Sequence, residues 1–108
     1  MTGVYTASYT VGGFSWDEHK SVDNLNLRGF DFAFAVRIFG GVTLEREDTR
    51  CDYGERRVIA VGMVEGRELT VVYTDRQILG LGIGRRIISA RRSNRHERQA
   101  YQRQLAQG

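Results

Sequence analysis

Two N-terminal segments are predicted to be helices, the first from its capping residues and the second from apolar positions that repeat every three to four residues. Asp17 is placed to cap the first helix, which we expect to run to about Leu27 and to end at Gly29. Asp31 is placed to cap the second helix, which stops at the glycine pair 40–41. The apolar stripe of that second helix consists of four side chains: Phe34, Ala35, Ile38 and Phe39.

The pattern then changes to alternation with many branched side chains, which predicts strands at 43–48, 58–64, 69–74 and 85–90. A tight turn at Glu65 and Gly66 joins the middle two. Asn94 with Glu97 forms a capping box that begins a last helix, ending near Leu105. We therefore expect an α+β fold with two N-terminal helices, an antiparallel sheet of about four strands and a C-terminal helix.

Residues 1–14 show no such regularity and read as an N-terminal extension, either loose or adding an edge strand, before a domain that spans 15–108. A chain of 108 residues with 41% hydrophobic and 27% charged residues suits one globular domain. The start lacks the features of a signal peptide, and no segment is long enough to span a bilayer, so we expect a cytoplasmic protein without membrane contact. A lone cysteine, Cys51, excludes a disulfide framework and a multi-thiolate metal site.

Charge is distributed unevenly along the chain. Residues 1–75 carry eight basic and twelve acidic side chains, whereas 76–108 carry eight arginines and one acid, Glu97. This asymmetry indicates a polyanion or an acidic protein as the partner of the C-terminal part, although a merely solvated basic face fits equally well. Fifteen of the sixteen basic residues are arginines, and Lys20 is the one lysine.

The strand expected at 85–90 ends in Ser89, Arg91 and Arg92 before the basic helix begins. Arginine binds phosphate oxygens two at a time, so this strand end suits an anionic ligand. The neighbouring glycines at 80, 82 and 84 do not form a nucleotide loop, because a strand follows them where a helix is needed. We interpret them as a flexible hairpin connection.

Other candidate sites are weaker. His19 and His96 fall in polar helical turns without a third ligand, so we expect exposed helix surface and no metal site. Glu45, Glu47 and Asp48 fit an acid–base site but more often decorate a strand or loop.

One set of polar residues survives as a candidate site: Lys20, Arg57, Tyr73, Ser89 and Arg91. Alternation in a regular strand places Ser89 and Arg91 on the same face as Ile87. The alternative interpretation of Tyr73 and Ser89 is ordinary sheet surface. The pattern by itself leaves both interpretations open.

Six motifs in order over residues 16–101 resemble the BrnT family of toxins. They are Trp16-Asp17-Glu18-His19-Lys20 followed by Asn24 and Gly29; Phe32, Ala35 and Phe39; Gly54-Glu55-Arg56-Arg57; Gly66-Arg67-Glu68-Leu69; Val71-Val72-Tyr73-Thr74-Asp75-Arg76; and Arg86-Ile87-Ile88-Ser89-Ala90-Arg91-Arg92 with Arg95, Glu97 and Tyr101. The chain departs from the family pattern at Leu27-Arg28-Gly29, in place of Lys-His-Gly, and in a longer segment at 77–84.

The resemblance implies a RelE-like fold and a ribonuclease of a type II toxin–antitoxin module that blocks translation. It implies a BrnA-like ribbon-helix-helix antitoxin as partner, and promoter DNA reached only through the toxin–antitoxin complex. The expected substrate is RNA, with ribosome-associated mRNA as one option, and no cofactor or metal is expected.

On this basis we expect Arg57 and Arg91 to stabilise a phosphate during attack by the neighbouring 2′-hydroxyl, with Ser89 bonding phosphate or ribose. Tyr73 or Lys20 is expected to transfer the proton, helped by a pKa that nearby arginines lower. The remaining residues that we expect to contact RNA are Trp16, Arg76, Arg86, Arg92 and Arg95. For Trp16, a place in the core is the alternative to stacking on a base.

Two other functions remain open. A non-catalytic basic nucleic-acid-binding protein predicts steep salt dependence without cleaved products. A protein whose arginines only dock an acidic antitoxin segment predicts harmless expression.

Overall fold

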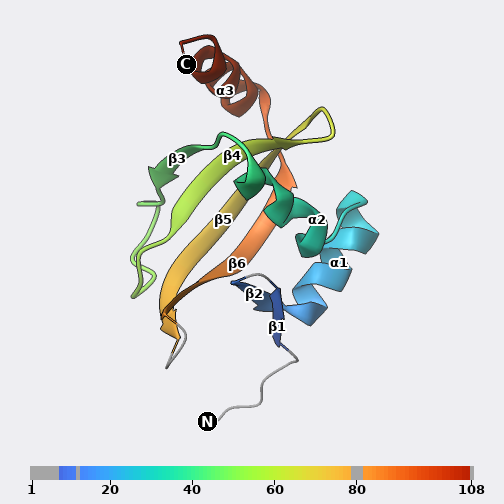
Figure 1. Ribbon diagram of the computed structural model, residues 1–108, viewed down its shortest axis with the longest axis vertical. Helices are drawn as coiled ribbons and strands as arrows, with labels where there is room; N and C mark the ends of the chain where they lie inside the picture. The colour runs from blue at the N-terminus through green and yellow to red at the C-terminus, as the bar shows by residue number, and fades with distance from the viewer. Residues whose placement is uncertain (1–7, 12, 79–81, 108) are drawn as a thin grey trace.

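The computed structural model describes residues 8–11, 13–78 and 82–107. In this part of the chain six strands form one sheet, in the order β1-β2-β6-β5-β4-β3 (Figure 1). The strands are β1 (Ser8–Val11), β2 (Phe14–Asp17), β3 (Leu44–Glu47), β4 (Val58–Val64), β5 (Arg67–Ile78) and β6 (Gly82–Arg92). The helices are α1 (Glu18–Arg28), α2 (Phe32–Ala35), the 3₁₀ helix η1 (Val36–Gly40) and α3 (Arg95–Gln107). None of these described helices has the length and apolar character needed to cross a membrane.

The α+β class is confirmed, but the expected antiparallel sheet of about four strands is wrong in width and in direction. Strand β2 pairs parallel to β6, with Phe14 beside Arg85 and Trp16 beside Ile87. Residues 8–11 form an antiparallel edge strand on β2, which is one of the two structures expected for the N-terminal segment. Strand β2 has only four residues, too few to show alternation, and its parallel partner β6 lies far away in the sequence.

Side-chain caps define where the helices begin. The Asp17 carboxylate accepts hydrogen bonds from the backbone N–H groups of His19 and Lys20, and Asp31 accepts one from Phe34. Gly29 ends α1 with a φ of 86°, a left-handed conformation that costs glycine little. The second helix is shorter than expected, because after Ala35 the chain tightens into η1.

The capping box of α3 is formed in both directions. The backbone N–H of Glu97 donates to the Asn94 side chain at 2.9 Å, and the Asn94 N–H donates to the Glu97 carboxylate at 2.8 Å. Helix α3 lies beyond the end of the sheet in Figure 1. Its buried Tyr101 anchors it there by donating a hydrogen bond to the Val42 carbonyl at 2.8 Å.

Helices α1 and α2 and the 3₁₀ helix η1 cover one face of the sheet (Figure 1), which we name the core face. Its strand residues are Trp16, Val58, Ala60, Val64, Leu69, Val71, Tyr73, Ile87 and Ala90. The helix layer adds Phe30, Phe32, Ala35 and Ile38. A Cβ atom at Gly62 would lie 2.6 Å from the Ile38 Cβ, so this glycine lets η1 approach β4 closely. Apolar burial of this kind supplies most of the stability of a small domain.

A β-bulge changes which side chains of β6 share a face. Tyr73 pairs with Ile87 whereas the preceding Val72 pairs with Ser89, so Ile88 is an extra residue in β6. As a result Ile87 and Ala90 are both buried in the core although they are three positions apart. The expectation that Ser89 and Arg91 point the same way as Ile87 is therefore wrong, because the bulge shifts the alternation by one residue.

The glycine-rich segment between β5 and β6 lies partly outside the described residues, since 79–81 are not described. Gly82 and Gly84, however, belong to β6 and pair with Ile78 and Arg76. The two strands are thus longer than expected, and most of the presumed loop is sheet.

Candidate functional site

The sheet face opposite the helices carries three rows of side chains that cross β4, β5 and β6. The rows are Arg57 with Thr74 and Arg86; Ile59 with Val72 and Ser89; and Val61 with Thr70 and Arg91. Arg57 belongs to the first row because it directly precedes Val58, which faces the core, and neighbouring residues of a strand point to opposite faces. A hydrogen bond from the Thr74 hydroxyl to the backbone carbonyl of Arg56 holds this part of the chain beside β5. We name this the basic face and define it by five residues: Arg57, Arg76, Arg86, Ser89 and Arg91.

At one end of the basic face Glu55 lies between two arginines. Arg57 Nε donates to its carboxylate at 3.0 Å and Arg76 Nη2 donates at 3.2 Å. The Arg57 guanidinium also lies 4.1 Å from the centre of the Tyr53 ring, which restricts its orientation. Burial alone would raise the pKa of Glu55, but the hydrogen bonds and charges of Arg57 and Arg76 outweigh it and lower the pKa below its ordinary value.

At the other end Arg91 forms a two-pronged ion pair with Glu97 of α3, at 2.7 and 2.8 Å. The Thr70 hydroxyl donates to the same carboxylate at 3.0 Å. Burial opposes ionisation of Glu97, but these hydrogen bonds and that from Asn94 lower its pKa to about 2. The ion pair raises the pKa of Arg91, so both groups are charged at neutral pH.

The segment between β3 and β4 adds a further cation. Asp48 is buried and binds the Arg50 guanidinium at 2.8 and 2.7 Å, and Tyr53 donates to it at 3.1 Å. These hydrogen bonds hold the pKa of Asp48 well below its usual range in spite of burial. Against the larger rise caused by Glu97, repulsion from the Arg50 guanidinium lowers the pKa of Arg91 slightly, so the two guanidinium groups are close enough to interact.

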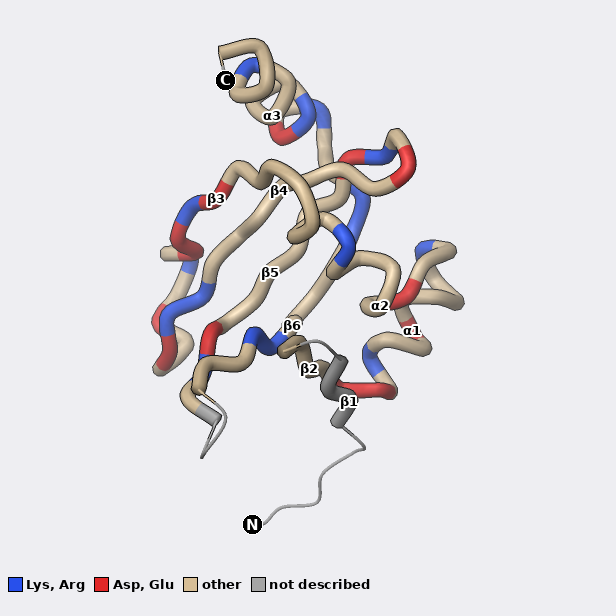
Figure 2. Tube along the Cα trace, in the orientation of Figure 1, with Lys and Arg blue, Asp and Glu red and all other residues tan. Residues whose placement is uncertain are grey.

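Sequence reasoning did not single out Arg50, Tyr53 or the carboxylate of Glu55. The available signal was the mixture of acids and arginines over residues 48–57, which flanks a predicted strand (Figure 2). Such a segment is more often solvated loop. Only the fold shows that it holds Arg57 in place.

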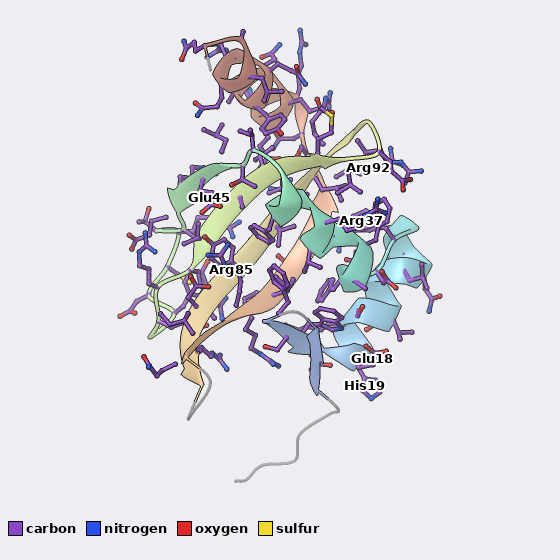
Figure 3. The ribbon with its side chains drawn as sticks, in the orientation of Figure 1. Glu18, His19, Arg37, Glu45, Arg85 and Arg92 are labelled. Carbon is purple, nitrogen blue, oxygen red and sulfur yellow. The ribbon has the colours of Figure 1, made fainter. Side chains whose placement is uncertain are left out.

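Tyr73 lies on the core face and is therefore separated from the basic face by the sheet. Its hydroxyl donates to Glu45 at 2.6 Å, and the Arg85 guanidinium lies 3.9 Å from its ring centre; both partners are labelled in Figure 3. Burial, followed by the hydrogen bond to Glu45, raises the pKa of Tyr73 to about 12. The expectation that nearby arginines lower its pKa is wrong, because the attraction of Arg85 is smaller than these two effects.

Three other predicted residues also lie away from the basic face, and a fourth lies at the start of α3. Lys20 is exposed on α1, within the helix layer. Trp16 is 2% exposed and belongs to the core, with its indole N–H donating to Glu18 at 3.2 Å, so its ring is not available to a base. Arg92 pairs with the core-facing Leu69 and thus points away from Arg91, and Arg95 is exposed at the start of α3.

Both histidines, His19 and His96, lie exposed on helices, as expected. Within the described ranges no group of three His, Cys, Asp or Glu side chains is arranged to hold a metal ion. The ion pairs of the basic face join arginines to carboxylates, Arg57 and Arg76 to Glu55 and Arg91 to Glu97.

The model of the BrnT family, described as a ribonuclease toxin of type II toxin–antitoxin systems, matches residues 16–97. The chain belongs to the BrnT family. The matched segment runs from β2 to the first turn of α3 and includes every residue of the basic face. A toxin of a type II system has an antitoxin as its partner, so membership implies one here. A comparison with curated proteins finds no match.

Proposed function

We propose that this chain is a RelE-like endoribonuclease toxin that cleaves RNA on the basic face without a metal ion and so inhibits translation. A cognate BrnA-like ribbon-helix-helix antitoxin neutralises it, and the pair binds promoter DNA through the antitoxin. The observation that carries the proposal is the gathering of Arg57, Arg76, Arg86, Ser89 and Arg91 on one sheet face, inside the segment that matches a ribonuclease family.

The arginines of this face already bind oxyanions in the geometry that phosphate needs. Arg91 donates to the Glu97 carboxylate from two nitrogens, and Arg57 and Arg76 both donate to Glu55. A phosphate offers similar oxygen acceptors to these guanidinium groups. Ser89 lies between the two ends, where its hydroxyl suits a ribose or phosphate oxygen.

These groups support cleavage by the 2′-hydroxyl of the RNA itself. Its oxygen attacks the adjacent phosphorus, and negative charge grows on the phosphoryl oxygens. Arg57, with Arg76 beside it, stabilises that charge, and Arg91 at the other end of the basic face binds a neighbouring phosphate of the same RNA. Tyr73 and Lys20 stay outside this mechanism because they lie on the other side of the sheet.

The proposal is tested with purified protein, end-labelled RNA and a chelator, with and without ribosomes. We expect cleaved RNA with 2′,3′-cyclic phosphate ends in the presence of the chelator. Arg57→Ala should slow cleavage by about 10²–10³-fold, as removal of one oxyanion donor does, and Arg91→Ala should slow it at limiting RNA by removing a phosphate contact. Arg92→Ala is the matched control, since it removes the next arginine of β6 from the opposite face.

Absence of cleavage by the wild type under both conditions, or full activity of both variants, contradicts the proposal. A second candidate function follows from the same ion pairs, because arginines that hold carboxylates also suit an acidic antitoxin segment. If that is their whole role, the two substitutions weaken antitoxin binding and no RNA is cut.

A further inference from the structure

Cleavage by a 2′-hydroxyl needs a group that accepts its proton, and the carboxylates beside the basic face differ in their capacity to do so. Glu97 is 11% exposed and already accepts four hydrogen bonds, from Arg91, Thr70 and the Asn94 backbone. Asp48 is 1% exposed and accepts bonds from Arg50 and Tyr53. Both carboxylates hold the structure together, Glu97 at the start of α3 and Asp48 in the β3–β4 segment.

Glu55 is more accessible and less occupied. Its side chain is 26% exposed, and one oxygen accepts from Arg57 and the other from Arg76. Each carboxylate oxygen has two acceptor positions, so both retain capacity for a further bond. A phosphate held by Arg57 and Arg76 would therefore lie next to this carboxylate.

We propose that Glu55 is the general base of the reaction, which rests on the proposed function of the basic face. The O2′–H bond breaks and the proton passes to a Glu55 oxygen, while O2′ forms a bond to phosphorus. The P–O5′ bond breaks, and the leaving O5′ takes a proton from a water molecule. Arg57 and Arg76 stabilise the phosphoryl oxygens throughout, and the proton on Glu55 returns to solvent after product release.

The charges around Glu55 suit this role. In the free protein the two arginines keep the carboxylate ionised, which is the form that accepts a proton. A bound phosphate brings negative charge to the same two arginines and offsets their effect on the carboxylate. Glu55 thus becomes a stronger base when substrate is present.

The test is a single-turnover pH–rate profile of the full chain with a short RNA. At pH 7 we expect Glu55→Gln to slow cleavage by about 10²–10³-fold, within the range for loss of a general base. The variant rate should then rise about tenfold per pH unit from pH 6 to 9, as hydroxide replaces the missing base, while the wild-type rate changes little. Glu47→Gln is the matched control, because it removes another ion pair to an arginine, Arg56, at 3.3 Å.

A purely structural role predicts a different result: the Glu55→Gln rate is lower by the same factor at every pH. If Glu55 is the general base, Glu55→Gln and wild type should bind a 2′-deoxy RNA analogue, which lacks the attacking hydroxyl, with affinities that differ by less than about threefold. Phosphate contacts supply most of that affinity, and the substitution leaves them in place. Glu55→Asp, which keeps a carboxylate, should recover part of the rate and a flat profile even if Glu55→Gln folds poorly.

Parallel profiles, or a loss of analogue binding as large as the loss of rate, overturn the assignment of Glu55. Wild-type cleavage with an equally active Glu55→Gln variant overturns this inference alone. A wild type that cuts no RNA overturns the proposed function as well.

Discussion

The two faces of the sheet are built from the same three strands but have opposite chemistry. On the core face Leu69, Val71 and Ala90 have no exposed surface and pack against the helix layer. One position along each strand, Thr70 and Arg91 bond to a carboxylate at the other face. Alternation alone separates stability from anion binding here, and the bulge at Ile88 decides which β6 residues go to which face.

Substitutions on the two faces should therefore have separable effects. A change on the core face alters the free energy of unfolding and leaves the chemistry of each folded molecule intact. A change on the basic face alters RNA cleavage and has a smaller effect on the free energy of unfolding. Four further substitutions test this separation, in order of decreasing expected effect.

Leu69→Ala should cost the most stability, because it removes a fully buried side chain from the middle of the core. We expect the free energy of unfolding to fall by about 2–5 kcal/mol, measured by denaturant titration. RNA cleavage per folded molecule should stay within about twofold of wild type, since the substitution is confined to the core face and removes no side chain of the basic face. A large loss of cleavage in the folded variant would show that the two faces are coupled.

Gly62→Ala should destabilise through overpacking. The added Cβ would lie 2.6 Å from the Ile38 Cβ, an atom close to the η1 backbone that has little room to move. We expect a loss of about 1–3 kcal/mol in the same titration. Gly40→Ala is the control from the same region, because nothing lies within 4 Å of its Cβ position.

Glu97→Gln tests the point where the basic face meets α3. Because folding lowers the pKa of Glu97 to about 2, its stabilising effect is present above pH 4.5 and is lost as pH falls toward 2. The variant should be about 1–2 kcal/mol less stable at pH 7, typical for hydrogen bonds to a charged group. The difference from wild type should shrink below pH 4, and a difference that is constant with pH would rule out this origin.

Tyr73→Phe should have the smallest effect. Cleavage should remain within about twofold of wild type, because Tyr73 is on the core face, and stability should fall by about 1 kcal/mol through loss of the bond to Glu45. Folding raises the pKa of Tyr73 to about 12, so wild-type stability should decline as pH rises from 10 to 12. That part of the decline should be missing in the variant. A strong loss of cleavage at pH 7 would return Tyr73 to the mechanism.

The local features of the fold were predictable from sequence. Asp17, Gly29 and Asp31 begin or end helices as expected, and the turn at Glu65 and Gly66 joins β4 to β5 with positive φ at both residues. The Asn94 and Glu97 capping box was equally readable. Each of these depends on side chains within a few residues of one another, so the sequence contains nearly all of the information.

The non-local features were not predictable in the same way. Parallel pairing of β2 with β6 joins segments about seventy residues apart, and the hydrophobic pattern of neither segment predicts its partner. The bulge leaves no mark in the sequence either, since Ile87-Ile88-Ser89 reads as a regular strand. Consequently the predicted site combined Arg57, Ser89 and Arg91, which share a face, with Tyr73 and Lys20, which do not.

The cations of the basic face are guanidinium groups, and the chain's one lysine, Lys20, lies on α1 instead. Arginine keeps its proton throughout the physiological pH range, and enzymes that acetylate lysine find no acceptor among the described residues of this surface. Neither acidification of the cell nor lysine acetylation can switch this surface off. A protein that covers these arginines with its own carboxylates is the direct way to block phosphate binding to the basic face.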